Sequence, residues 1–237
     1  MSELGFPLAI LAELTHRCPL ECPYCSNPLA LEASSAELST AAWKDVMREA
    51  AELGALQIHF SGGEPTARRD LEDLVAFAAS VGLYSNLITA GVLLSRERVT
   101  ALAKAGLDHV QLSFQDSEAA GCDRIGGYKG GFEKKLDCAR WVKECRLPLT
   151  LNMVVHRQNL DHLEELLQLA ERLESERVEI AHVQYYGWAY LNRAALMPTR
   201  AQLEQATATV EAARERLKGI MVIDYVVPDY YARRPKC

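Results

Sequence analysis

Short apolar stretches alternate along the chain with segments whose apolar residues recur every three or four positions. The first pattern is typical of buried β-strands and the second of amphipathic helices. Their regular alternation predicts parallel βα units rather than hairpins. Six strands are predicted, over residues 8–14, 56–60, 84–88, 109–114, 149–155 and 178–183.

Residues that favour helix ends flank the periodic segments. Those of N-cap type are Ser39, Asp70, Ser95, Asn159 and Thr199, and the glycines that close helices are Gly54, Gly82, Gly106 and Gly219. Thr199 and Gln202 form a capping-box sequence. A further helix is expected over residues 132–145, before a proline that cannot continue it.

Polar residues interrupt the predicted strands, often at alternate positions. They are Glu13, His59, Gln111, Ser113, Asn152, His182 and Gln184. Strands covered on both faces are almost wholly apolar, and a buried polar side chain is costly unless it is hydrogen-bonded. The set therefore predicts an open α/β barrel with a polar interior, although each residue taken singly also fits a satisfied core side chain.

Composition and charge narrow the classes of protein. The 237 residues are 49% hydrophobic and carry a net charge of -6, which excludes a nucleic-acid footprint of clustered basic residues. No apolar run approaches the roughly 18 residues of a membrane span, and no secretory signal is recognised. We expect a soluble cytoplasmic protein with reduced thiols, and, because no linker-like stretch divides the chain, a single domain over residues 1–237.

Three of the seven cysteines, Cys18, Cys22 and Cys25, have the spacing CxxxCxxC directly after the first predicted strand. Thiolates are soft ligands that select iron–sulfur clusters, zinc or copper(I). No fourth cysteine or well-spaced histidine follows within reach, and three ligands on a four-iron cluster leave one iron open to a substrate or cofactor. The alternatives are a zinc loop or three unrelated buried thiols.

A second motif, from Ser61 to Pro65, follows the second predicted strand at the end where parallel barrels place their active-site loops. Gly62 and Gly63 allow the backbone to approach a ligand closely, and Glu64 completes a Gly-Gly-Glu sequence. The alternative is a simple turn.

Together the two motifs resemble those of the radical S-adenosylmethionine (SAM) enzymes, whose fold is a partial (βα)6 TIM-like barrel. The resemblance implies a [4Fe–4S] cluster held by the three cysteines, with SAM chelating its fourth iron and the Gly-Gly-Glu segment accepting hydrogen bonds from the SAM amino group. It also implies that Tyr24 stacks on the adenine and that Ser113 binds the ribose. Asn152 and residues 89–91 fall at cofactor-facing positions. A side chain added at Gly63 is accordingly expected to weaken SAM binding while leaving the cluster loop intact.

Three longer stretches resemble one family within this superfamily. They cover residues 11–20, 83–89 and 184–198, and the similarity continues over 222–232. The family is PqqE, the SPASM-type PqqA peptide cyclases of pyrroloquinoline quinone biosynthesis. Membership implies a radical that starts a carbon–carbon cross-link between a glutamate and a tyrosine of the PqqA precursor peptide, the peptide chaperone PqqD as partner, and an external electron donor such as flavodoxin.

The chain departs from that family at its end. Family members continue into a SPASM region with auxiliary iron–sulfur clusters, whereas this sequence stops at Cys237, near the expected position of the first auxiliary ligand. Residues 1–237 are therefore expected to be the radical SAM core alone. Two other functions stay open, namely another SPASM-type peptide-modifying enzyme and a non-catalytic barrel that binds a peptide or PqqD.

Overall fold

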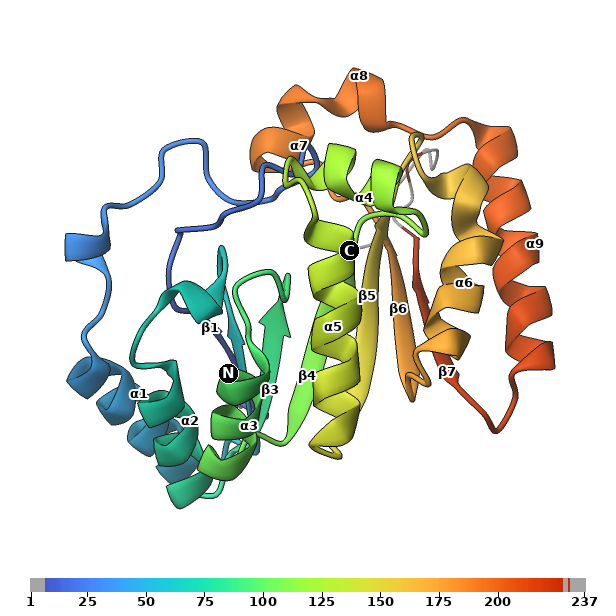
Figure 1. The fold of residues 1–237 in the computed structure, drawn as a ribbon. Helices are drawn as coiled ribbons and strands as arrows, with labels where there is room; N and C mark the ends of the chain where they lie inside the picture. The colour runs from blue at the N-terminus through green and yellow to red at the C-terminus, as the bar shows by residue number, and fades with distance from the viewer. Residues whose placement is uncertain (1–6, 228–229, 231–237) are drawn as a thin grey trace, which may run out of the picture. The chain divides into compact units, whose positions relative to one another are not determined.

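The computed structural model describes residues 7–227 and Tyr230; Cys237 lies outside the described residues. The chain forms two compact units. The first comprises Met1–Pro19, Ala30–Leu112 and Glu133–Leu149, and the second comprises Leu20–Leu29, Ser113–Phe132 and Thr150–Cys237. Each unit is built from parallel strands and the helices between them (Figure 1).

The first unit contains four strands that pair in parallel in sequence order. The strands are β1 (Ala9–Glu13), β2 (Gln57–Ser61), β3 (Tyr84–Thr89) and β4 (His109–Phe114), whose last two residues belong to the second unit. The helices are α1 (Thr40–Glu52), α2 (Leu71–Ser80), α3 (Arg96–Ala105) and most of α5 (Gly131–Glu144), with short 3₁₀ turns at Ser34–Ala36 and Pro65–Ala67. Helix α2 packs against both α1 and α3 (Figure 1).

The second unit contains three more strands, again paired in parallel in sequence order. They are β5 (Leu149–Val155), which begins in the first unit, β6 (Arg177–His182) and β7 (Val222–Val226). Its helices are α4 (Ala119–Gly126), α6 (Leu163–Arg172), α7 (Gly187–Leu191), α8 (Arg193–Leu196) and α9 (Arg200–Arg216), with a 3₁₀ turn at Leu160–His162. Helix α9 contacts α6 and β7.

The predicted strands and helix ends are largely confirmed. All six predicted strands are present within one residue or so of the expected bounds, and β7 is an addition. Helix α5 matches the segment expected over 132–145. The four closing glycines all have positive φ, the conformation that favours glycine at a helix end.

The N-cap predictions divide into two groups. Ser39, Ser95 and Thr199 cap their helices through the side chain, and Thr199 forms the capping box with Gln202. Asp70 and Asn159 precede helical segments but make no capping bond. Their side chains bind other partners, because tertiary contacts offer Asp70 an arginine and offer Asn159 the backbone of Gln115.

Candidate functional site

In the first unit, the segment that leads into Cys18 runs beside the glycine-rich turn after β2. The Gly63 amide donates to Thr15 O at 2.7 Å, and the Glu64 amide donates to Arg17 O at 2.8 Å. A Cβ at Gly62 would lie 2.5 Å from Thr15 O, and a Cβ at Gly63 would lie 2.6 Å from Arg17 O and from the carbonyl oxygen of His16. The structure thus requires glycine at both positions for the close approach of two backbone segments.

This packing corrects one expectation. A side chain at Gly63 was expected to spare the cluster loop, but its Cβ would press directly on the backbone next to Cys18. The expectation is wrong because Gly63 packs directly against the backbone of His16 and Arg17, which leads into Cys18.

The carboxylate of Glu64 is completely buried and fully engaged. One oxygen accepts from the amide and hydroxyl of Thr66 and from the Thr89 hydroxyl at 2.7 Å. The other accepts from the Ala90 amide at 2.7 Å. The carboxylate therefore joins the turn after β2 to the end of β3. Because its oxygens already accept hydrogen bonds from the protein, only the backbone of the Gly-Gly-Glu segment is available to a ligand.

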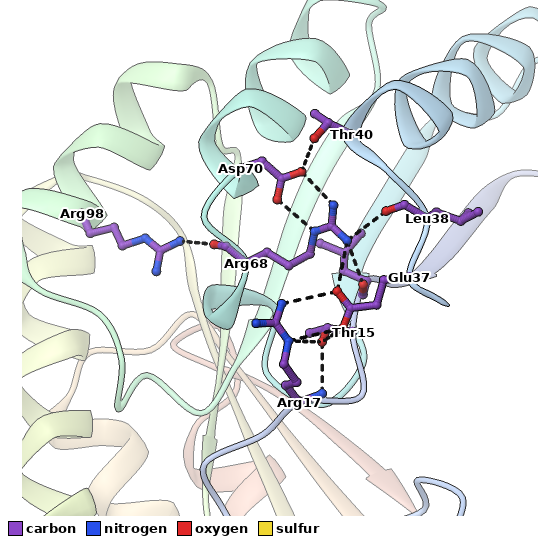
Figure 2. Close-up of polar contacts among 9 residues, drawn as sticks. Thr15, Arg17, Glu37, Leu38, Thr40, Arg68, Asp70 and Arg98 are labelled. Carbon is purple, nitrogen blue, oxygen red and sulfur yellow. Dashed lines mark hydrogen bonds and ion pairs between the residues drawn. The ribbon is translucent and has the colours of Figure 1, made fainter. Parts of the chain in front are cut away.

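A network of charged residues also holds this segment (Figure 2). The nearly buried Arg68 guanidinium pairs with Asp70 at 2.7 Å and approaches Glu37 to 3.6 Å, and it also donates to Leu14 O at 3.3 Å. Glu37 in turn accepts from the Thr15 hydroxyl and pairs with Arg17 at 3.3 Å. The network thus ties the residues just before Cys18 to the loop before α1.

The partners in this network lower the pKa values of the Glu37 and Asp70 carboxyls. Burial raises the pKa of the Glu37 carboxyl, but hydrogen bonds from Thr15 and Arg17 and the charges of Arg17 and Arg68 outweigh it, so the pKa is lowered below its ordinary 4.5. At Asp70 burial likewise opposes the bonds from Arg68 and Thr40, and the pKa is lowered below its ordinary 3.8. Sequence reasoning missed both Arg68 and Glu37, because nothing local marks two ionic partners 31 residues apart.

We expect Arg68→Gln to lower the free energy of unfolding by about 3 kcal/mol, because it leaves the carboxylates of Glu37 and Asp70 without the positive charge of their shared partner. Arg48→Gln, which removes an exposed pair with Asp45, should cost less than about 1 kcal/mol. Urea unfolding followed by circular dichroism measures both.

The ionised carboxylates of Glu37 and Asp70 stabilise the fold above pH 4.5, because their pKa values are lower in the folded state than in the unfolded chain. This stabilisation is lost as the pH falls below 4.5 and the two carboxylates become protonated. Arg68→Gln should therefore show a shallower acid loss, and an unchanged acid profile would contradict the assigned network.

Three neighbouring strands of the first unit carry a polar row. The Asn86 amide lies 3.1 Å from Nδ1 of His59, its register partner on β2. It also donates at 3.2 Å to Oε1 of Gln111, which follows the register partner of Asn86 on β4 by two residues. His59 and Gln111 were predicted to share a face, and these contacts confirm it. Asn86 was missed, although its place between them in a predicted strand was a usable signal. Within the described residues its buried Oδ1 has no hydrogen-bond partner.

In the second unit, Cys22 and Cys25 form the two ends of a tight turn. The Cys25 amide donates to Cys22 O at 3.1 Å, and Pro23 occupies the second position, where its fixed φ favours such a turn. The Tyr24 hydroxyl accepts from Gln115 Nε2 at 3.2 Å. The Tyr24 ring centroid lies 5.4 Å from that of the buried His156, so one neighbour of this ring is an imidazole.

His156 itself is neutral at ordinary pH, because burial, and secondarily the charge of Arg124, lowers its pKa to about 4. Its Nδ1 accepts from the Gln158 amide at 3.2 Å, which places the proton on Nε2. Within the part of the chain that the structure describes, Nε2 has no partner.

Helix α7 and the residue after it hold the cysteine turn. The Ala189 amide donates to Cys25 O at 3.1 Å, and the Asn192 side chain donates to Pro23 O at 3.0 Å. Gly187 has a φ of 51°, and a Cβ there would collide with Asn27 O. The stretch over 184–198 was singled out only by resemblance, and its contact with the turn was not predicted.

Ser113 and Asn152 are half-buried residues of β4 and β5. Burial alternates along β4, with Gln111 and Ser113 on the more open face, as the pattern predicted. In the described residues the Asn152 Oδ1 is buried without a hydrogen-bond partner. An orphaned acceptor of this kind suits a ligand that donates a hydrogen bond, such as a hydroxyl. Their roles toward a cofactor stay predictions.

Cys18, Cys22 and Cys25 form no disulfide; Cys18 is exposed and the other two are half-buried, so their chemistry fits soft-metal ligation. The chain passes from the first unit to the second between Cys18 and Cys22. Among the described residues no preformed group of three Cys, His, Asp or Glu side chains stands ready for a metal. Ligation of one cluster by all three thiolates stays a prediction.

Two other cysteines behave as apolar residues. Burial, and secondarily the charge of Glu64, raises the pKa of Cys138 to about 12, so its thiol stays protonated. Cys145 is half-buried, with its sulfur 3.9 Å from the Thr100 hydroxyl.

Among the described residues, no helix combines the length and the hydrophobicity that a membrane span requires.

The chain is similar to curated proteins over nearly its whole length. It is 67% identical over 232 residues to the PqqA peptide cyclase of Rhodopseudomonas palustris and 61% identical over 232 residues to that of Bradyrhizobium diazoefficiens. These matches cover 98% of this chain in both cases, and 62% and 61% of the relatives. The chain thus spans less than two thirds of their length, and the resemblance drawn from the sequence motifs is confirmed.

Solved structures share the fold. Streptococcus suis SuiB bound to S-adenosylmethionine superimposes with a TM-score of 0.80 at 19% identity, covering 94% of this chain and 51% of that one. Native anSMEcpe with bound AdoMet and a Cp18Cys peptide superimposes with a TM-score of 0.74 at 16% identity, covering 92% and 63%. This likeness confirms the expected α/β fold of the radical SAM type. The family described as the Radical SAM superfamily matches residues 12–170, and the chain therefore belongs to the radical SAM superfamily.

Proposed function

We propose that residues 1–237 form the radical SAM core domain of a PqqA peptide cyclase. The observation that carries the proposal is the high identity to proteins of that name across almost the entire chain. The chemistry within each unit supports it. In the first unit Cys18 follows β1 and a glycine turn follows β2, and in the second unit Asn152 of β5 has a buried amide oxygen without a hydrogen-bond partner among the described residues. Parallel α/β folds place their active-site loops at the ends of their strands.

In this proposal Cys18, Cys22 and Cys25 hold a [4Fe–4S] cluster. When bound, the cluster supplies the electron that cleaves SAM to methionine and a 5′-deoxyadenosyl radical. The backbone of Gly62, Gly63 and Glu64 accepts from the SAM amino group. The cofactor contacts assigned to the remaining side chains are stacking on adenine by Tyr24 and hydrogen bonds to the ribose side by Ser113 and Asn152.

The radical that bound SAM would supply would take a hydrogen atom from the γ-carbon of a PqqA glutamate and become 5′-deoxyadenosine. The glutamate carbon would then bond to the tyrosine ring, and loss of one electron and one proton would restore the ring. The peptide ends two hydrogens lighter. The natural acceptors of that electron are the auxiliary iron–sulfur clusters, which are expected only in the full-length family member. PqqD presents the peptide, a donor such as flavodoxin reduces the cluster, and we assign the protein to the cytoplasm.

Release of 5′-deoxyadenosine from SAM tests the proposal. The anaerobically reconstituted and reduced chain should produce it, and the same chain without iron should not. Chromatography quantifies the product with and without PqqA, while mass spectrometry detects the loss of two hydrogens from the peptide. A reconstituted, reduced protein that leaves SAM intact would favour the non-catalytic peptide- or PqqD-binding barrel. Cleavage that modifies another peptide but never PqqA would favour a different SPASM-type enzyme.

A further inference from the structure

An open groove of about 590 Å³ lies on the second unit beside α7 and α8. It is lined by Arg157, Tyr190, Leu191, Arg193, Ala194 and Met197. The proposed chemistry uses none of these residues.

The groove concentrates positive charge on an acidic protein. Both arginines are exposed, and within the described residues neither guanidinium is paired with a carboxylate. Other arginines of the same unit are paired, for example Arg177 with Asp224 and Arg216 with Glu164. On a chain with a net charge of -6, two arginines without acidic partners at one groove mark a site for an anion.

Local contacts orient both guanidiniums while using little of their capacity. Arg157 Nη1 donates to Ala194 O at 3.2 Å, and the Arg193 guanidinium lies 5.6 Å from the centroid of the Tyr185 ring. Because a guanidinium carries five N–H donors in a planar fork, each arginine retains donors for a carboxylate.

The rest of the lining is apolar. Tyr190 and Leu191 are 63% and 59% exposed, and Met197 is half-buried. A ligand that satisfies the whole groove therefore combines a carboxylate with apolar or aromatic groups close by. A free inorganic anion would leave the apolar side uncovered, whereas an acidic peptide segment meets both requirements.

The groove is joined to the cysteine turn within the same unit. Asn192 stands between the lining residues Leu191 and Arg193, and its side chain donates to Pro23 O of the turn. The Ala189 amide, one residue before Tyr190, donates to Cys25 O. A peptide held in the groove is thus held by the segment that supports Cys22 and Cys25.

We propose that this groove binds an acidic segment of the peptide substrate, with Arg157 and Arg193 receiving glutamate carboxylates. The inference rests on the proposed function for the identity of the peptide, and it deepens that function by assigning a substrate-binding surface.

Fluorescence anisotropy with labelled synthetic PqqA tests the groove. Two peptides are compared, PqqA itself and PqqA with every glutamate replaced by glutamine. They are titrated with the unmodified chain, with the double variant Arg157→Gln/Arg193→Gln, and with the control Lys218→Gln. The control removes one positive charge from an exposed residue of the same unit that does not line the groove.

The double variant should bind PqqA about tenfold more weakly, since two charge-assisted contacts are lost. Lys218→Gln should bind as the unmodified chain does. The glutamine peptide should bind the unmodified chain and the double variant equally weakly, and added salt should weaken PqqA binding most in the unmodified chain.

Equal affinity of the unmodified chain and the folded double variant for PqqA overturns the groove and leaves the proposed function standing. Failure of the unmodified chain to bind either peptide overturns the groove and the peptide assignment together. Release of 5′-deoxyadenosine still reports separately on the enzyme class. Weakened binding of PqqD with unchanged binding of PqqA would assign the groove to the chaperone and so contradict the proposal.

Discussion

Replacing any one of Cys18, Cys22 and Cys25 by Ala should abolish the [4Fe–4S] cluster. With three thiolates, one iron of the cube lacks a protein ligand; with two, a second iron is exposed to solvent and to chelators. No neighbouring residue is expected to substitute, because the sequence places no fourth cysteine or well-spaced histidine close to the CxxxCxxC motif. Iron and sulfide assays and the absorbance near 400 nm after anaerobic reconstitution measure the loss.

Cys145→Ala is the matched control. This thiol is also half-buried, but it lies beside Thr100 and outside the CxxxCxxC motif, so full iron content is expected. If each of the three motif variants kept full iron and sulfide, the ligand assignment would be wrong and a zinc loop or three unrelated thiols would regain support.

Gly63→Ala should reduce cluster content as well as SAM binding. The added Cβ would lie 2.6 Å from two carbonyl oxygens, of His16 and Arg17, closer than real Cβ contacts permit. The backbone ahead of Cys18 must therefore move, and the bonds from the Gly63 and Glu64 amides to that segment are strained or lost. Overpacking of this kind costs about 1–3 kcal/mol in free energy of unfolding.

Urea unfolding, iron content and SAM affinity by calorimetry, measured on the same preparation, separate the effects. Gly126→Ala is the control, since its Cβ would meet its nearest neighbour, Leu20, at an ordinary 3.5 Å and the residue sits at a helix end. Normal stability and iron content in Gly63→Ala, with SAM affinity alone reduced, would show that the glycine faces the cofactor rather than the loop.

Most of the secondary structure was predictable from the sequence because it is encoded locally. The apolar stretches became β1 to β6, and glycines with positive φ ended the helices where a pattern break was expected. β7 escaped prediction because its five residues include Asp224 and Tyr225 and are mostly exposed or half-buried. Its strand conformation depends on pairing with β6, which is a long-range contact.

The sequence identified candidate residues for the site, but it did not predict which partners their side chains contact. The motifs identified the cysteines and Gly-Gly-Glu as a set, since ligand chemistry depends on residue type and spacing. They could not show that the Glu64 carboxylate accepts hydrogen bonds from Thr66, Thr89 and Ala90. Nor could they show that Asp70 forms an ion pair with Arg68 instead of capping α2. Such partners are chosen by burial, which forces each polar group to take whatever donor or charge the fold brings near it.

What the sequence by itself determined is the βα alternation, most of the helix ends and, through resemblance, the superfamily, whereas the ligand role of the cysteines stays a prediction. Each depends on periodicity, turn preference or spacing within a short window. Only the tertiary structure decided that Gly62 and Gly63 pack on the backbone before Cys18, and that Asn192 supports a turn 169 residues earlier. These contacts join segments remote in sequence, and their energies arise from close packing and from satisfying buried polar groups, which no local pattern records.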